Sequence, residues 1–233
     1  FYQNDPIRTI RINYEGTFNL LNLANSHNAK ILFTSTSEVY GETKNYPQEE
    51  NMPIKLSTFS PRACYSEGKR IAETLINSYR EKYNLETKIA RVFNTYGPRL
   101  NIDDGRVISN FIKQCLTGDK LTIYGNGSQT RSFCYVSDLI EGLLALMETN
   151  YYYPINIGNE DEISIIKLAD LIKSKINKEI IFEYQNLPID DPKRRRPCLN
   201  KAKKYLKWSP KISLMEGLKQ TISSYKDILS LKN

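Results

Sequence analysis

Residues 30–41 have the sequence KILFTSTSEVYG, and this stretch decides the fold class. Its first half, 30–35, is a short apolar run with the length of a buried β-strand. Its second half is a run of polar residues that ends in Gly41. Side chains at the carboxyl end of a parallel strand face the crevice where α/β sheets bind ligands. The stretch therefore predicts a strand that delivers polar side chains to a ligand site.

Helices and strands alternate on both sides of this stretch. Helical spacing of apolar residues runs from Pro6 to Ser26 before it and over 66–82 after it, and a second apolar run at 87–93 predicts another strand. This order is typical of a parallel sheet with crossover helices. We expect an α/β fold: a Rossmann-like, doubly wound parallel sheet followed by a smaller α+β lobe.

Beyond Gly97 and Pro98 the alternation becomes less regular, as expected for such a lobe. The sequence there predicts these helices and strands: helices at 107–116, 136–148, 163–176 (with Ser164 as its N-cap) and 214–231, and strands at 120–124, 154–157 and 179–184.

Composition excludes several other classes of protein. The 233 residues are 40% hydrophobic and 25% charged, which is globular and neither disordered nor fibrous. No apolar run approaches the roughly 20 residues of a membrane helix. The four cysteines are far apart and are expected to be reduced thiols of a cytoplasmic protein. His27 is the only histidine and has no ligand partners at suitable spacing, so we expect no metal.

The net charge of +7 does not by itself identify a partner. Basic residues are spread along the chain and mixed with acids, and only 193–196 form a basic run. Solvated lysines together with a small anionic ligand account for the excess as well as a polynucleotide would. We expect no nucleic-acid partner.

The segment YSEGK at 65–69 places a phenol and an ammonium one helical turn apart. A nearby ammonium lowers the pKa of a phenol and supplies a general base that this histidine-poor sequence otherwise lacks. The spacing alone arises by chance in many helices. Here it lies between two polar clusters at strand ends, 34–41 and 91–99, and the combination predicts an active site.

With these clusters in place, the sequence resembles the extended short-chain dehydrogenase/reductases that modify nucleotide sugars. The resemblance is carried by the following segments: TSTSEVYG at 34–41, PRACYSEGKRIAETL at 61–75, RVFNTYGPRLNIDDGRVISNFI at 91–112, GSQTRSFCYVSDL at 127–139, DDPKRRRP at 190–197 and KWSP at 207–210. It implies NAD as cofactor and a UDP-sugar as substrate. It also implies that 1–96, with 135–150 returning to it, belongs to the NAD-binding domain, and that 97–134 and 151–233 form the substrate-binding lobe.

Within the family the segments are most similar to those of UDP-glucuronate decarboxylases. Related 4,6-dehydratases have an Asp between the Thr and the Glu that follow the strand, where it helps a hydroxyl leave. In this sequence that position is Ser37, which is too weak an acid to expel hydroxide, whereas loss of CO2 needs no protonated leaving group. The resemblance therefore implies conversion of UDP-glucuronate to UDP-xylose through a 4-keto sugar, which could also be released. A nucleotide-sugar 4,6-dehydratase or 4-epimerase is the alternative enzyme.

The resemblance also assigns roles to individual residues. The expected catalytic residues are Tyr65, Lys69, Thr36, Ser37, Glu38 and Arg195. The expected cofactor contacts are Thr34, Tyr65, Lys69, Thr95 and Arg106. The expected substrate contacts are Arg195 at the sugar carboxylate, Arg131, Asn94 and Asn110 around the diphosphate, and, with less support from the pattern, Arg11, Asn19 and Tyr79.

The family's glycine-rich turn, GxxGxxG, does not occur in this sequence. By the size of βαβ units, roughly 80 residues of the family pattern are missing at the front. We therefore expect a fragment or a natural truncation, and a non-catalytic nucleotide-sugar-binding subunit stays open as an alternative. By analogy, the helices at 6–26 and 66–82 are expected to pair across a two-fold axis into the four-helix bundle of a homodimer.

Overall fold

A computed structural model describes residues 4–176, 179–187 and 192–230. The chain forms two compact units. The first comprises Phe1–Phe93, Glu141–Ile157 and Pro197–Ser209, and the second comprises Asn94–Ile140, Gly158–Arg196 and Pro210–Asn233. In the part of the chain that the structure describes, no helix combines the length and apolar character needed to cross a membrane.

The first unit is built on a three-stranded parallel sheet in the order β1-β2-β7. Its strands are β1 (Ile31–Thr36), β2 (Thr87–Val92) and β7 (Ile155–Ile157). Ser35 is the register partner of Arg91, and Ala90 is the partner of Ile155. The predicted α/β class with a parallel sheet is confirmed, and so are the strands expected at 30–35, 87–93 and 154–157.

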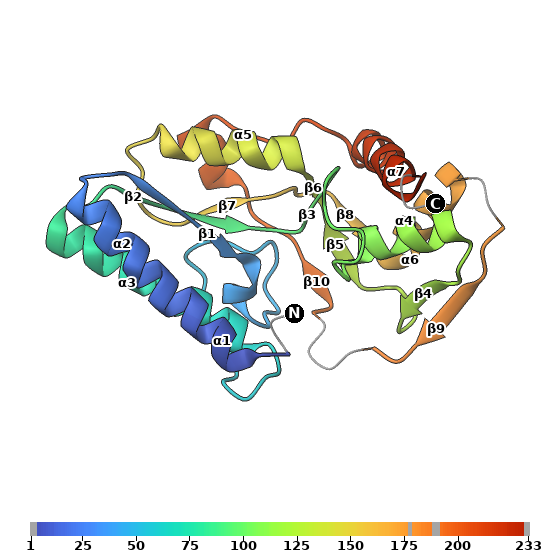
Figure 1. The fold of residues 1–233 in the computed structure, drawn as a ribbon, viewed down its shortest axis with the longest axis horizontal. Coiled ribbons are helices and arrows are strands. Elements are labelled where there is room, and N and C mark those ends of the chain that lie inside the picture. The colour runs from blue at the N-terminus through green and yellow to red at the C-terminus, as the bar shows by residue number, and fades with distance from the viewer. Residues whose placement is uncertain (1–3, 177–178, 188–191, 231–233) are drawn as a thin grey trace. The chain divides into compact units, whose positions relative to one another are not determined.

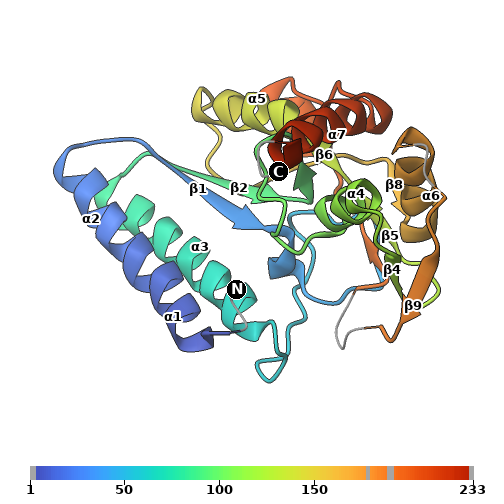
Figure 2. The same cartoon turned by 45° about the vertical axis from the view of Figure 1, so that its right-hand side comes forward.

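Helices cover both faces of this sheet (Figure 1). On one face lie α1 (Pro6–Arg11), a π-helical turn η1 (Ile12–Gly16), α2 (Thr17–Ser26) and the long α3 (Ala63–Tyr83). The part of α5 (Val136–Met147) from Glu141 onward lies on the other face, and the π-helical turn η3 (Ala202–Leu206) contacts β7. Figure 2 shows α3 running beside the continuous helical segment of α1, η1 and α2.

The first helix begins where the sequence predicts. Asp5 caps it by accepting a hydrogen bond from the main-chain N–H of Arg8 at 3.0 Å, and Pro6 occupies the first turn. A proline is tolerated there because that N–H would have no helical partner. Leu21 and Ala24 of this helical segment pack in a small core cluster with Ile76 and Ile89.

Among its described residues, the second unit combines short strands with three whole helices and the first residues of α5. Its strands pair as β3 (Thr95–Tyr96) with β6 (Cys134–Tyr135), β4 (Leu121–Tyr124) with β9 (Phe182–Gln185), and β10 (Arg194–Arg195) and β8 (Glu162–Ser164) on either side of β5 (Thr130–Ser132). Its helices are α4 (Val107–Thr117), α6 (Ile165–Ile176) and α7 (Leu214–Ser230). They enclose one large apolar cluster that includes Phe111, Leu168 and Tyr225.

Several boundaries differ from those expected. The helix predicted from residue 163 begins at Ile165, because Glu162–Ser164 pairs antiparallel with β5. Ser164 still serves as the cap, since its hydroxyl oxygen accepts a hydrogen bond from the Lys167 N–H at 3.4 Å. The strand predicted at 179–184 is confined to Phe182–Gln185. The predicted end of the last helix at Leu231, and Asp190 and Asp191, lie outside the described residues.

Five strands among the described residues were not predicted, namely β3, β5, β6, β8 and β10. Each has two or three residues, too few for an alternating pattern to be recognised. Segment 197–209 lies with the first unit, where Cys198 donates its N–H to the Gln48 carbonyl at 2.8 Å. The domain boundaries expected from the sequence stay a prediction.

Candidate active site

Helix α3 carries the tyrosine and the lysine that the sequence predicts as the proton-transfer pair. Tyr65 and Lys69 lie one turn apart near its start, and both are half-buried. The Lys69 ammonium donates a hydrogen bond to the main-chain carbonyl of Thr34 at 3.0 Å and lies 4.6 Å from the centre of the Phe33 ring. These contacts fix Lys69 against the end of β1.

Burial lowers the pKa of the Lys69 ammonium, because its charged form has lost part of its hydration. The electric field of a cation is also less screened in such a place than in water. A cation held there favours the deprotonated form of a neighbouring phenol. The arrangement can therefore support proton removal by Tyr65.

The polar residues after β1 form a tight turn, the 3-10 helix η2 (Ser37–Tyr40). Thr36 caps this turn, since its Oγ1 accepts a hydrogen bond from the Glu38 N–H at 3.2 Å. A threonine hydroxyl in that role still has its own proton to donate. Ser37 is buried, and the Glu38 carboxylate forms an ion pair with Arg62 at 3.3 Å. Thr34, Thr36, Ser37 and Glu38 thus lie in the same unit as Tyr65 and Lys69.

Arg62, Glu73 and Arg91 are further charged residues beside the site to which no sequence motif assigned a role. Arg62 immediately precedes α3 and holds Glu38. Glu73 forms a buried ion pair with Arg91, with 2.7 Å between Arg91 Nη2 and Glu73 Oε2. The spacing of four residues from Tyr65 through Lys69 to Glu73 was a signal that could have found Glu73.

In the second unit, Arg131 and Arg195 are register partners on the parallel strands β5 and β10. They are only 9% and 5% exposed. Partner side chains lie on the same face of a sheet, so two buried cations leave the same face of this small sheet. Like charges so placed are costly, and an anionic ligand would offset their repulsion. Arg194, by contrast, points to Glu162 and forms an ion pair with it.

The remaining predicted residues of the second unit lie around β3 and α4. Asn94 directly precedes β3, and its Nδ2 is buried without an acceptor among the described residues. Thr95 lies in β3, and Asn110 lies in the first turns of α4. Arg106 occupies the N-cap position of α4, where its side chain makes no capping hydrogen bond; it is exposed and forms an ion pair with Asp104 at 3.3 Å. The orphaned amide of Asn94 is a donor that a ligand could satisfy.

Three predicted substrate residues lie on the helices that cover the first sheet. Arg11 is exposed and forms an ion pair with Glu15 at 2.8 Å. Asn19 is exposed. Tyr79 packs in the core cluster, and its hydroxyl donates to Asn22 at 2.6 Å. Their proposed roles in substrate binding stay predictions.

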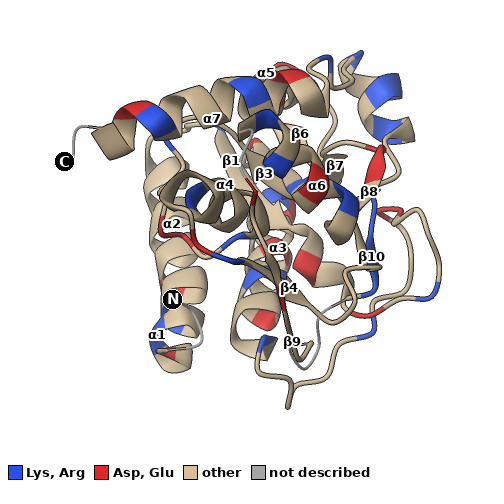
Figure 3. Ribbon diagram, turned by 90° about the vertical axis from the view of Figure 1, so that its right-hand side faces the viewer, with Lys and Arg blue, Asp and Glu red and all other residues tan. Residues whose placement is uncertain are grey.

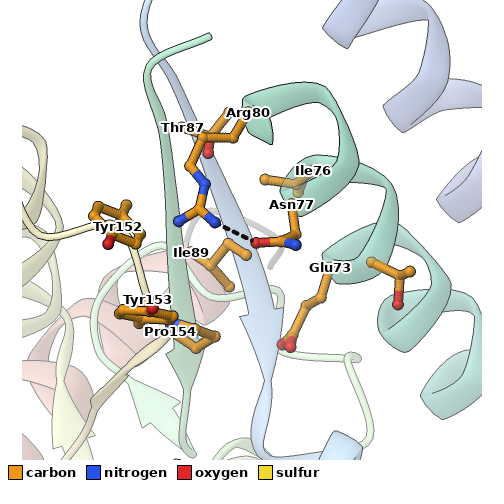
Figure 4. A pocket seen from close by; sticks show the side chains of 10 residues that line it. Glu73, Ile76, Asn77, Arg80, Thr87, Ile89, Tyr152, Tyr153 and Pro154 are labelled. Atoms are coloured by element: carbon orange, nitrogen blue, oxygen red, sulfur yellow. Dashed lines mark hydrogen bonds between the residues drawn. The ribbon is translucent and has the colours of Figure 1, made fainter. Parts of the chain in front are cut away.

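A cavity of about 280 Å³ lies between α3, β2 and 152–154 (Figure 4). The Arg80 guanidinium lies 4.1 Å from the centre of the Tyr152 ring and donates to Asn77 at 2.8 Å. Glu73 lines the same cavity, where its side chain extends from α3 toward the sheet. Both charged groups are engaged by the fold, so the cavity is a packing feature of the first unit.

Charged residues are mixed along the chain. Figure 3 shows basic and acidic residues on the same helix, for example on α6. The four cysteines are buried and form no disulfide within the described residues, as expected.

A parallel sheet covered by helices on both faces, with a Tyr–Lys pair at its strand ends, defines a short-chain dehydrogenase/reductase. Residues 3–221 match the family model described as GDP-mannose 4,6 dehydratase. The chain belongs to this family.

The similar proteins modify nucleotide sugars. UDP-glucuronic acid decarboxylase 3 of Arabidopsis thaliana is 52% identical over 94% of the chain, and UDP-glucuronic acid decarboxylase 1 of Danio rerio is 47% identical over 96%. The chain spans 64% and 54% of the lengths of these relatives.

Solved structures of epimerases are also similar. UDP-glucose 4-epimerase of Thermotoga maritima, with UDP-glucose, has a TM-score of 0.91 and 28% identity, covering 98% of this chain and 74% of that one. UDP-glucuronic acid 4-epimerase of Bacillus cereus, in complex with UDP-glucuronic acid and NAD, has a TM-score of 0.84 and 31% identity, covering 94% and 68%.

Proposed function

We propose that this chain is the catalytic and sugar-binding part of an NAD-dependent decarboxylase that converts UDP-glucuronate to UDP-xylose. The observation that carries the proposal is the half-buried Lys69, one turn from Tyr65 and hydrogen-bonded to the end of β1. The turn that follows this strand presents Thr36, Ser37 and Glu38. The similarity to named UDP-glucuronic acid decarboxylases supports the choice of substrate.

The residues present fit the nicotinamide-ribose end of NAD. Tyr65 offers a phenol and Lys69 an ammonium at the carboxyl ends of parallel strands, where such sheets bind dinucleotides. Thr34, Thr95 and Arg106 are further proposed contacts. When bound, NAD supplies the oxidation of the sugar at C4 and its later reduction. The family's glycine-rich pyrophosphate turn is not within these 233 residues.

Tyr65 removes the proton of the C4 hydroxyl as C4 is oxidised, and Lys69 stabilises the resulting phenolate. Thr36 holds the same hydroxyl through the proton that its cap interaction leaves available. The C4 ketone is β to the C6 carboxylate, so cleavage of the bond to CO2 leaves its electron pair in a stabilised enolate. Ser37 and Glu38 organise the site in which C5 is then protonated, and Tyr65 returns its proton to the C4 oxygen when C4 is reduced.

Anion recognition is assigned to the second unit. Arg195 binds the sugar carboxylate in two-point geometry. Arg131, its register partner, binds the diphosphate together with Asn94 and Asn110. The burial of both arginines and the orphaned Asn94 amide support these roles. Without a ligand the two guanidinium groups repel each other.

A second candidate is 4-epimerisation of UDP-glucuronate. The likeness to the UDP-glucuronic acid 4-epimerase of Bacillus cereus favours it. Both reactions begin with oxidation at C4, and they differ in whether the carboxylate is retained. The mass of the product therefore separates them.

We also propose a cytoplasmic homodimer. The helices α1 to α3 expose large apolar side chains, namely Ile7, Ile12, Leu20, Leu23 and Ile71. Burying such a surface against a second copy is favourable. A four-helix bundle of the helical segments at 6–26 and 66–82 with their symmetry mates would achieve this, and light scattering of the purified chain tests it.

The test is incubation with UDP-glucuronate and NAD, followed by mass spectrometry of the sugar nucleotide. Loss of CO2 with formation of UDP-xylose is the expected result, and Tyr65→Phe should reduce turnover on the order of 10²- to 10⁴-fold. Tyr83→Phe, an exposed tyrosine of the same helix, is the matched control and should be active.

An isomer of unchanged mass would instead establish the epimerase. A longer form of the chain that includes the glycine-rich turn is tested in parallel. If both forms bind UDP-glucuronate without converting it, the result would favour the non-catalytic nucleotide-sugar-binding subunit. Turnover by the longer protein alone would mark the chain as a fragment of the enzyme.

A further inference from the structure

A buried ion pair ties helix α3 to the sheet one turn beyond the catalytic lysine. Glu73 and Arg91 have side chains that are 11% and 7% exposed. Their contact is bidentate, with Arg91 Nε 3.0 Å from Oε1 and Nη2 2.7 Å from Oε2 of Glu73. Burial alone would lower the pKa of the Arg91 guanidinium, but the bonds to Glu73 and the Tyr40 ring beside it raise it. The Arg91 guanidinium therefore stays charged, and the bidentate contact fixes the geometry of the pair.

The pair is also bonded to β1. Ser35 donates its hydroxyl proton to Glu73 Oε1 at 2.5 Å. Ser35 lies directly opposite Arg91 in the sheet register and follows Thr34, whose carbonyl binds Lys69. Glu73 is four residues after Lys69, so both side chains leave the same face of α3. Two neighbouring sets of hydrogen bonds therefore join α3 to the strands. One links Lys69 to Thr34, and the other links Glu73 to Ser35 and Arg91.

The network continues to the far side of Arg91. Its Nη1 donates to the Glu50 carbonyl at 3.1 Å, and its guanidinium lies 4.9 Å from the centre of the Tyr40 ring. The Tyr40 hydroxyl donates to Asn156 Oδ1 at 2.6 Å. Asn156 in turn donates to the carbonyl of Gln48 at 2.9 Å. Arg91 is therefore immobilised by the loop before α3 and, through Tyr40, by strand β7.

A buried ion pair contributes little to stability compared with a well-packed apolar pair, because desolvation offsets its attraction. What a bidentate pair adds is a fixed distance and angle. We propose that Glu73 and Arg91 are positioning residues that hold α3 in the one register against β1 in which Lys69 and Tyr65 meet the substrate. The inference rests on the proposed function of that site.

Loss of the Glu73–Arg91 pair should lower the reaction rate and change the pKa of Lys69. A helix held only by apolar contacts can shift by a fraction of an ångström, and misplacement of about 1 Å costs on the order of 100-fold in rate. The same freedom lets water reach the Lys69 ammonium and weakens the desolvation that lowers its pKa. Neither effect requires loss of the fold.

The decisive variant replaces both charges at once. Glu73→Leu combined with Arg91→Met leaves no unpaired buried charge, and the cavity beside residue 73 gives the new side chain room. Removing both charges also cancels their direct electrostatic influence on Lys69. The matched control is Glu67→Leu with Arg70→Met, a half-exposed pair on the same helix at 3.1 Å.

Three quantities are measured: the thermal midpoint, the pKa of Lys69 by ¹⁵N NMR of its side chain, and kcat and KM with UDP-glucuronate and NAD. The double variant should keep its thermal midpoint, raise the Lys69 pKa toward the ordinary value of about 10.4, and lose kcat on the order of 10- to 100-fold with little change in KM. Arg91→Lys keeps the charge without the two-point geometry and should show the same loss of kcat. The control should match the wild type throughout.

A double variant with wild-type kcat and wild-type Lys69 pKa would overturn the inference. So would a control variant with the same losses, because the effect would then belong to any pair on α3. If the wild-type chain does not decarboxylate UDP-glucuronate, the proposed function fails, while the Lys69 titration still decides whether the pair positions that side chain.

Discussion

The two units differ in what they bury. Next to α3, the first unit encloses Arg91, Glu73 and Asn156 in one hydrogen-bonded network. Its two nearby apolar clusters consist of six and three buried residues among those described. The second unit encloses one apolar cluster of 18 buried residues among those described. An apolar core tolerates small shifts, whereas hydrogen bonds and ion pairs fix angles. The hydrogen-bonded network beside α3 therefore fixes the geometry of the part of the first unit that carries Tyr65 and Lys69.

The largest expected effect is the loss of stability when the apolar cluster of the second unit is disrupted. Leu168→Ala should lower the free energy of unfolding by about 2–5 kcal/mol, because a fully buried side chain leaves a cavity. Urea unfolding of both proteins measures it. Leu144→Ala, at a position that is 62% exposed, is the control and should change little. A small effect at Leu168 would mean that the second unit does not depend on its cluster.

Tyr40→Phe tests the hydrogen-bonded network of the first unit. The variant removes the hydroxyl that donates to Asn156 and leaves a buried amide oxygen without that donor. We expect a loss of about 1–3 kcal/mol in the same unfolding experiment. Tyr184→Phe, at a position that is 59% exposed, should be close to neutral. If Tyr40→Phe and Tyr184→Phe change the free energy of unfolding equally, the hydrogen-bonded network of the first unit adds no stability.

Replacing two helical glycines by alanine should change the stability of the protein in opposite directions. A Cβ on Gly217 in the second unit would lie 2.2 Å from the Tyr96 hydroxyl oxygen, whereas one on Gly16 in the first unit would meet nothing within 4 Å. Gly217→Ala should therefore destabilise by about 1–3 kcal/mol through overpacking. Gly16→Ala should stabilise by about 0.5–1 kcal/mol through its better helix propensity. Thermal unfolding of both variants measures these changes. It shows whether close packing requires glycine at position 217 in the second unit but not at position 16 in the first.

The smallest expected effect is a pH dependence of opposite sign in the two units. Burial raises the pKa of Glu50, whereas the hydrogen bond from Arg194 lowers the pKa of Glu162. Glu50 therefore favours the folded state most below the ordinary glutamate pKa of about 4.3 and loses this contribution as pH rises through its raised pKa. Glu162 contributes above the ordinary pKa and loses its contribution as pH falls through its lowered value.

Glu50→Gln and Glu162→Gln, unfolded in urea at about pH 7 and about pH 4, separate the two signs. Relative to its variant, the wild type should gain stability at the lower pH for position 50 and at the higher pH for position 162. A common direction would show that burial does not dominate at Glu50.

The prediction from sequence succeeded where a pattern is local. The strand at 30–35, the first helix with Pro6 in its first turn and the helix that carries Tyr65 and Lys69 follow from spacing and from residue types within a few turns. The family followed from short motifs in the same way, and the match over residues 3–221 confirms it. The strands β5 and β10 were missed because pairing with distant residues creates them.

For the site, the sequence by itself determined which groups are available: a phenol, an ammonium, hydroxyls, carboxylates and arginines. Only the tertiary structure decided which of them meet. Tyr40 and Asn156 are 116 positions apart in the chain, and Glu73 and Arg91 are 18 apart on different elements. No local periodicity encodes such a pairing, because it depends on strand register and on the angle at which a helix packs.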